Sequence, residues 1–290
     1  MANLRDLRLR MRAIRQTLQV TRAMDLISTA KLRKGRKTLE NIEPYFKRIQ
    51  KSMGNILSGA GSVESEFFNR IPAAPRSAII VVSSDRGLAG GFNANVFRQV
   101  NSLCETLANP ILVLIGSVGY RYFLHSPYII LENFSFQSRL PELQDAQEIA
   151  DFIIAQFLWG VFDEVYIIYT HMHSAIKLVP ALTQILPLSA ERMSKAGGTE
   201  KADIIDFEYI PSKEAVFDTL APLYIKGVIY GAMAESYVSE QSARMAAMNE
   251  ASRNAEDMLA SLQIQYNRVR QAGITSEVSE IISGSAALQK

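Results

Sequence analysis

A glycine-rich segment is the first place in this sequence where chemistry could occur. Residues 84–93 read SDRGLAGGFN, after an apolar run and before a segment of helical periodicity. Backbone N–H groups of such loops can cradle phosphate at a helix start. The segment lacks G-x-G-x-x-G spacing and a P-loop Lys-Ser or Lys-Thr pair, and no ribose-binding acid follows about 20 residues later. A tight turn that contacts a partner is favoured, and a nucleotide-dependent α/β enzyme with a coiled-coil oligomerisation arm is the alternative.

Two of the three histidines and the single cysteine are the other side chains that could do chemistry. His171 and His173 stand two apart at an expected strand end, so their rings can face one way, yet no third ligand has metal-binding spacing. We expect satisfied or exposed imidazoles. The single cysteine, Cys104, excludes an internal disulfide framework and is predicted to be a small buried hydrophobe. No catalytic residue, metal site or cofactor is expected.

The elements that carry these residues alternate between strands and helices from about residue 77 to 188. Short apolar runs predict buried strands of a mainly parallel sheet. The expected strands are residues 78–82, 111–115, 128–134, 165–169 and 176–186, and the expected helices are residues 93–108, 117–124 and 143–160. Pro180 would confine the last strand to an edge or a bulge. Residues 189–205 are expected to be a surface loop.

Both ends of the chain carry heptad patterns. In residues 4–56 two apolar positions recur every seven residues, and a second seam runs from Phe217 to Val269. A helix of nearly eighty residues would reach roughly 115 Å at 1.5 Å per residue. The predicted fold class is therefore α/β: a long antiparallel coiled coil of the N- and C-terminal helices, residues 1–58 and 212–290, with an inserted Rossmann-like α/β domain at residues 75–210.

Several residues modify this coiled coil. Small or polar residues interrupt the N-terminal seam: Thr21, Asp25, Ser28 and Gly35. Pro44 is expected to kink or restart the helix. Small residues of the C-terminal seam are expected to permit close approach of the two helices: Gly227, Gly231 and Ala234. Because the seam fails after Val269, the last 20 or so residues should form a single helix whose apolar side chains need another protein around them.

Charge is distributed unevenly along the chain. Residues 1–51 hold fourteen Lys or Arg against four acidic residues, a net charge of +10, whereas the remainder carries −8. Such a basic helix indicates an acidic partner surface on a protein, a nucleic acid or a lipid layer. A nucleic-acid-binding coiled coil is disfavoured because the arginines interleave with heptad residues. No apolar run approaches the roughly 18 residues that span a bilayer.

Five segments resemble the gamma subunit of F-type ATP synthase. They are SEQSARMAAMNEASRNA at residues 239–255, YNRVRQAGITSEVSEI at 266–281, TRAM at 21–24, AKLRK at 30–34, and the loop at 84–93. The likeness covers essentially the whole chain. It implies a non-catalytic central-stalk rotor of a proton- or sodium-translocating enzyme, which transmits rotation between the membrane ring and three catalytic beta subunits.

The resemblance also implies contact residues and partners. By position, Arg270 and Gln271 match the pair that bonds a beta-subunit loop, and a guanidinium fork suits acidic loop residues. Further contact residues carried over from the family are Met24, Lys31, Arg33, Lys34, Gly87, Leu88, Gly90 and Gly91. The implied partners are the alpha and beta subunits, the epsilon subunit and the ring of c subunits. A peripheral location on the cytoplasmic face of a bacterial cell membrane is expected.

Overall fold

The computed structural model describes residues 4–58, 63–68, 72, 74–136, 139–174, 177–189 and 209–288. The predicted loop at residues 189–205 lies outside the described residues, apart from Ser189. The chain forms two compact units, Met1–Ser28 with Arg244–Lys290, called unit 1, and Thr29–Ala243, called unit 2. The division into residues 1–58 with 212–290 and residues 75–210 stays a prediction.

The order of elements confirms the predicted fold class. Among the described residues, one long helix precedes and another follows five strands and three shorter helices in the sequence. They are α1 (Leu4–Ser58), β1 (Arg76–Val82), α2 (Phe92–Cys104), β2 (Asn109–Ile115), α3 (Ser117–Phe123), β3 (Ile129–Phe134), α4 (Leu143–Leu158), β4 (Glu164–Met172), β5 (Leu178–Leu186) and α6 (Lys213–Leu288). Helix α1 continues through Pro44, so the proline does not restart it.

The sheet of unit 2 has the order β3-β2-β1-β4-β5. Strands β1 to β4 pair in parallel, and β5 pairs antiparallel with β4. The apolar runs form the central strands because such strands are buried on both faces. Pro180 lies on the edge strand β5, where its missing N–H removes no central ladder bond.

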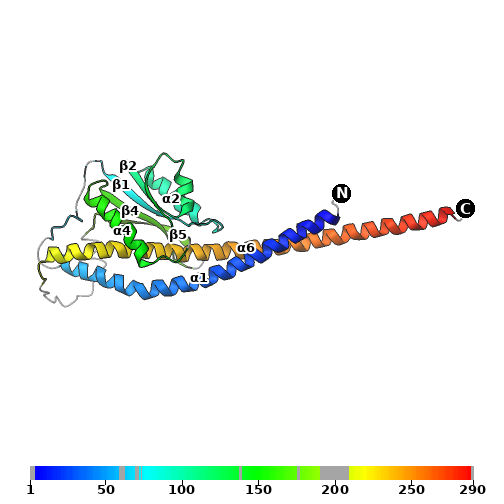
Figure 1. Cartoon of the computed structure of the whole chain (residues 1–290), viewed down its shortest axis with the longest axis horizontal. Helices are drawn as coiled ribbons and strands as arrows, with labels where there is room; N and C mark the ends of the chain where they lie inside the picture. The colour runs from blue at the N-terminus through cyan, green and yellow to red at the C-terminus, as the bar shows by residue number, and fades with distance from the viewer. Residues whose placement is uncertain are drawn as a thin grey trace. The chain divides into compact units, whose positions relative to one another are not determined.

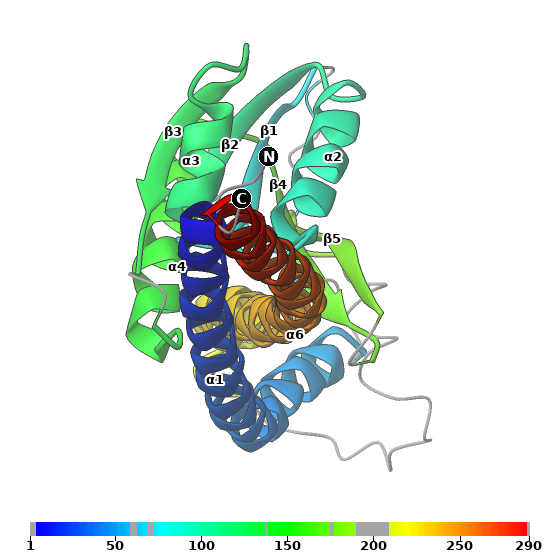
Figure 2. The same ribbon diagram turned by 90° about the vertical axis from the view of Figure 1, so that its right-hand side faces the viewer.

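Alternate residues of the strands pack into two different cores. On one face, Ile79 and Val81 pack with α2 and α3. On the other face, Ile80 and Val82 pack with α4, the second half of α1 and the first part of α6. Figure 2 shows α2 and α4 on opposite sides of the strands. The second half of α1 and the first part of α6 thus belong to the core of unit 2.

Within each unit the long helices run antiparallel, as predicted (Figure 1). In unit 1, Arg8 reaches Tyr266 and Thr21 reaches Ser252. In unit 2, Phe46 lies against Gly227, where an added Cβ would meet its ring carbon at 2.1 Å. Gly227 therefore permits close approach as expected. The expectation for Gly231 is wrong, because nothing lies within 4 Å of a Cβ built there.

Candidate functional site

The glycine-rich segment forms a loop that is closed by its own hydrogen bonds. The Ser84 N–H donates to Asn93 Oδ1 at 3.1 Å, the Asn93 amide donates to Ser84 Oγ at 2.7 Å, and Ser84 Oγ donates to the carbonyl of Arg86 at 2.8 Å. Leu88 has a φ of 65° and is 63% exposed. Its neighbour Ala89 is buried. The loop consequently displays one large apolar side chain on a rigid base.

Asp85, the acidic residue of this loop, forms hydrogen bonds with the segments that follow two neighbouring strands. Its Oδ1 accepts bonds from the Ser117 N–H at 3.0 Å, from Ser117 Oγ at 3.2 Å and from Ser135 Oγ at 3.0 Å. Ser117 follows β2 and Ser135 follows β3. The carboxylate thus joins the loops after β1, β2 and β3, which gives it a structural role.

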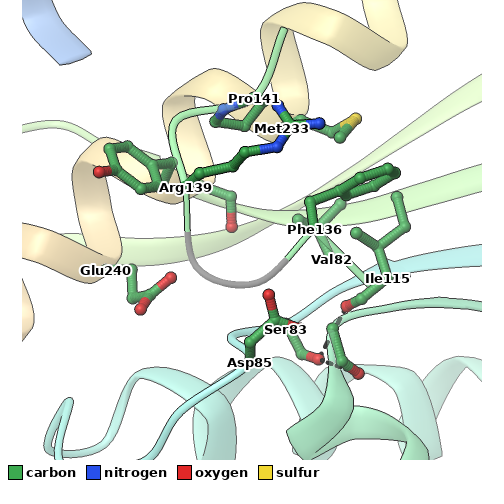
Figure 3. A pocket seen from close by; sticks show the side chains of 12 residues that line it. Val82, Ser83, Asp85, Ile115, Phe136, Arg139, Pro141, Met233 and Glu240 are labelled. Carbon is green, nitrogen blue, oxygen red and sulfur yellow. Dashed lines mark hydrogen bonds between the residues drawn. The ribbon is translucent and has the colours of Figure 1, made fainter. Parts of the chain in front are cut away.

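A small hollow lies at the carboxyl ends of β1 and β2, the edge where open α/β sheets bind nucleotides. Figure 3 shows Val82, Ser83 and Ile115 on one side of it, and Met233 and Glu240 from α6 on another. Its volume is about 40 Å³. Ligand pockets typically measure about 300–1,000 Å³. The hollow therefore has no room for a nucleotide, and α6 occupies the edge that a nucleotide would need.

The walls of this hollow are themselves tightly joined. Ser83 Oγ donates to the carbonyl of Ile115 at 2.8 Å and accepts the Gly119 N–H at 3.0 Å. Gly116 has a φ of +99°, and a Cβ there would stand 2.3 Å from the Ser83 carbonyl oxygen. The two strand ends approach one another more closely than a side chain at residue 116 would allow.

The expected cationic contact residues lie along α1. Lys31, Arg33 and Lys34 belong to unit 2, with Lys31 half-buried and the other two exposed. Met24 belongs to unit 1 and is half-buried. These side chains are accessible enough to meet a partner, but only Arg33 and Lys34 stand fully at the surface.

Arg270 and Gln271 lie in the part of α6 that belongs to unit 1, and both are exposed. Beyond them all side chains from residue 272 to 283 are exposed. This stretch includes four large apolar residues, exposed by 48–71%: Ile274, Val278, Ile281 and Ile282. The ten predicted contact residues thus fall into three groups: the loop at residues 87–91, the cationic part of α1 and the end of α6.

The two histidines singled out from the sequence have different surroundings. His171 Nδ1 pairs with Glu235 of α6, and the His173 ring lies 4.5 Å from the His171 ring, nearly perpendicular to it. The described residues contain no group of three or more side chains that could hold a metal ion. His171 is therefore a satisfied imidazole, as predicted, while His173 is exposed.

The partner of His171 is a residue that the sequence did not point to. Burial, the largest influence, raises the pKa of Glu235, and the nearby His171 opposes this shift. Glu235 also accepts the Met172 N–H at 3.4 Å. No spacing rule links a strand end to a helix that begins about forty residues later, so only the folded chain reveals this pair.

The sequence also did not predict a cluster of buried polar residues on α6. Its members are Ser236, Ser239, Glu240, Gln241 and Ser242. Ser239 Oγ donates to the carbonyl of Thr170 in β4 at 3.0 Å. Four of the five belong to the segment at residues 239–255 that was singled out above, which gives part of that segment a packing role against the sheet.

A search of the described helices found none with a stretch long and apolar enough to cross a bilayer.

Comparison with known proteins gives one consistent family. The family model described as ATP synthase matches residues 3–288. The ATP synthase gamma chain of Acetivibrio thermocellus is 41% identical, with all of both chains covered. The sodium-ion-specific gamma chain of Acetobacterium woodii is 36% identical over 99% of each chain. A mitochondrial ATP synthase structure from Euglena gracilis, containing OSCP, F1 and c-ring, has a chain that matches with a TM-score of 0.70 at 16% identity, covering 98% of this chain and 94% of that one.

Proposed function

The chain belongs to the family of ATP synthase gamma chains, and from this premise we infer that it is the central-stalk rotor subunit of the enzyme. In this role it transmits rotation between an ion-driven ring in the membrane and three catalytic beta subunits. The coupling ion, a proton or sodium, is selected by that ring and not by this chain.

The chain itself performs no catalytic step in this proposal. The glycine-rich loop bonds to itself through Ser84 and Asn93, and α6 covers the sheet edge where a nucleotide would bind. ATP chemistry then belongs to the alpha and beta subunits, and this chain contributes asymmetry and stiffness.

The observation that carries the proposal is the exposed end of α6. Among residues 256–283, whose side chains the structure describes, none is buried. Large apolar side chains such as Ile274 and Ile281 are mostly exposed there. Contiguous apolar exposure of this kind marks a surface that another protein covers. A sleeve formed by alpha and beta subunits would bury these side chains while the helix turns inside it.

Charge and position assign the remaining contacts. Arg270 and Gln271 would bond a loop of the beta subunit, because a guanidinium donates two parallel bonds to a carboxylate. Lys31, Arg33 and Lys34, with Met24 nearby in sequence, would face an acidic segment of beta. The loop at residues 87–91 would contact the base of the catalytic head.

The α/β part of unit 2 and the helix segments packed on it would bind the epsilon subunit and the c ring. The chain would therefore be peripheral, held at the cytoplasmic face of a bacterial cell membrane through these partners.

Reconstitution with alpha and beta subunits tests the proposal. Replacing both Arg270 and Gln271 by Ala should lower the torque and the rate of ATP hydrolysis. Arg268→Ala is the matched control, because it removes the same charge from an exposed position about 200° around the same helix. Unchanged torque and hydrolysis in the double variant would show that Arg270 and Gln271 do not make the proposed contact with the beta subunit. Failure of the unaltered chain to assemble and rotate would remove the rotor role itself.

A further inference from the structure

A buried hydroxyl group on α6 has no hydrogen-bond partner among the described residues. Ser236 is 2% exposed, and its Oγ neither donates to nor accepts from another protein group in the part of the chain that the structure describes. A buried polar group without a hydrogen bond costs free energy, so most such groups in folded proteins bond to protein or to ordered water. The rotor role does not explain why this hydroxyl is buried.

Ser236 lines the small hollow at the carboxyl ends of β1 and β2, and all residues around this hollow belong to unit 2. The volume of about 40 Å³ excludes a nucleotide but not water. A cavity needs about 10–15 Å³ of accessible space to hold one water molecule, which occupies about 30 Å³ in the liquid. The hollow therefore has room for one to about three waters.

The hollow also contains the further polar groups that a bound water needs. An internal water ordinarily makes about two to four hydrogen bonds. Figure 3 shows the Glu240 side chain, from a residue that is 6% exposed, on the other side of the hollow from Ser83 and Asp85. A carboxylate has about four lone-pair positions on its two oxygens. Glu240 and Asp85 can therefore accept bonds from water in addition to those from protein donors.

The lining residues favour water over other occupants. A wholly apolar cavity stays dry, but the hydroxyl of Ser236 and the carboxyl of Glu240 make this one polar. Arg139 also lines the hollow, and its positive charge opposes a bound cation. Within the described ranges, no group of three or more acidic, histidine or cysteine side chains could hold a metal ion. Water satisfies the polar groups without adding charge.

We propose that the hollow is a hydration site, in which at least one ordered water bridges Ser236 of α6 to the polar groups at the carboxyl end of β1. This water is the hydrogen-bond partner of the Ser236 hydroxyl. The site does not depend on the rotor role, because all its residues lie within unit 2.

The hydration site makes two attachments of α6 to the sheet different in kind. At β4, Ser239 Oγ donates directly to the carbonyl of Thr170 at 3.0 Å. At the end of β1 the contact passes through water, which is nearly as favourable in enthalpy as a direct hydrogen bond. A water can move and bond again without a change in either side chain. The helix can therefore shift slightly against β1 while its polar groups stay hydrogen-bonded.

A crystal structure of the full chain, at a resolution that shows ordered water, tests the proposal directly. A water should lie within about 2.5–3.0 Å of Ser236 Oγ, and within hydrogen-bonding distance of Glu240 or Asp85. A dry hollow, or a Ser236 hydroxyl bonded to a protein group instead, would overturn the hydration site. A crystal soaked in rubidium chloride separates water from a monovalent cation, because bound rubidium gives an anomalous signal. A rubidium peak in the hollow would also overturn the proposal.

Magnetic relaxation dispersion of water counts the long-lived internal waters of the chain in solution. Ser236→Ala should have about one fewer such water than the unaltered chain, because the hydroxyl that holds it is gone. Ser239→Ala is the matched control and should keep the same number, since Ser239 bonds directly to the carbonyl of Thr170. An unchanged number in Ser236→Ala would show that Ser236 does not hold the water.

The stability of these two variants gives an independent comparison. Both replace a buried serine of α6 by alanine and gain the same helix propensity, so their difference reflects the lost hydrogen bonds. With water bound to Ser236, their equilibrium constants for unfolding of unit 2 should agree within about tenfold. A dry, unsatisfied hydroxyl would make Ser236→Ala the more stable variant by more than about tenfold, which would overturn the proposal. If either variant does not fold, the crystal structure of the unaltered chain still decides.

Discussion

Helix α6 belongs to both units, and the two parts are stabilised in different ways. In unit 2 its side chains fill a core, since Phe217, Ile225 and Ile229 are completely buried. In unit 1 the buried residues among the described α6 side chains, up to residue 283, are small or flexible, namely Met248, Ser252 and Ala255. One unbroken helix thus depends on packing in one part, and on helical propensity and a narrow seam in the other.

The facing parts of α1 differ in the same way. In unit 2 the residues Ile49, Met53 and Ile56 are buried in the core beneath the sheet. In unit 1 Leu7 and Met11 are buried, but Thr21 and Ser28 occupy the same seam further along. A thin, partly polar seam contributes less hydrophobic stabilisation per turn, so unit 1 should gain more than unit 2 when other proteins surround it.

The largest predicted effect comes from truncating the core of unit 2. Ile229→Ala should lower the free energy of unfolding of that unit by about 3 kcal/mol, because it leaves a cavity at a fully buried site. Leu262→Ala in unit 1 is the counterpart, and it should cost only about 1 kcal/mol because its side chain is half-buried. Chemical denaturation followed by hydrogen exchange in each unit measures both losses. Equal losses of unfolding free energy would contradict the inference that unit 2 depends more on core packing than unit 1 does.

Two glycines on the same stretch of α6 test how closely the helices of unit 2 pack. Gly227→Ala should destabilise unit 2 by about 2 kcal/mol, because the new methyl group meets the Phe46 ring. Gly231→Ala should stabilise it by about 0.5–1 kcal/mol, because the new methyl group enters open space and the helix gains propensity. The midpoints of chemical denaturation measure both changes. Effects of the same sign would contradict the packing described for Phe46.

The polar seam of unit 1 should show a smaller and non-additive effect. Thr21 and Ser252 share a buried hydrogen bond of 2.8 Å between their hydroxyls. Thr21→Val should cost about 1 kcal/mol, since it leaves the Ser252 hydroxyl without this partner. Ser252→Ala should cost less, because the Thr21 hydroxyl keeps its bond of 3.1 Å to the Leu18 carbonyl. The double variant should be close to neutral because both polar groups are gone. A double-mutant cycle on the unfolding of unit 1 measures the coupling, and strict additivity would show that the bond contributes nothing.

The smallest effect concerns a surface ion pair of unit 1. Arg22 pairs with Glu256, and their side chains are 62% and 48% exposed. Arg22→Gln should change stability by less than about 0.5 kcal/mol, and added salt should remove the difference. Denaturation at low and high ionic strength makes the comparison. A loss above about 1.5 kcal/mol would mean that unit 1 relies on surface charge more than on its seam.

Periodic features of the chain could be predicted from the sequence. The heptads predicted both long helices within a few residues, and the continuous apolar runs predicted β1, β2 and β4. The further strands expected at residues 128–134 and 176–186 correspond to β3 and β5. These features are local, because a helix or a strand repeats its burial every few residues. The tight turn in the segment at residues 84–93 was predicted from its glycines, which are also a local signal.

Features that depend on distant contacts could not be predicted. Nothing in the apolar runs places β4 beside β1, and nothing near Gly231 distinguishes its open surroundings from the crowded ones of Gly227. The pair of His171 with Glu235 likewise depends on how a helix crosses a strand end. The candidate contact residues came from likeness alone, since exposed cations and glycines carry no periodic signal.

Cys104 matters for experiments that follow the motion of this chain through an attached label. It is the only cysteine, it is buried, and burial raises the pKa of its thiol to about 11. Because the thiolate is the reactive form, this group stays almost inert toward maleimides at neutral pH. A cysteine introduced at the exposed Leu88 would then be the single site of attachment, so a fluorophore or a bead could be placed there without removing any native residue elsewhere.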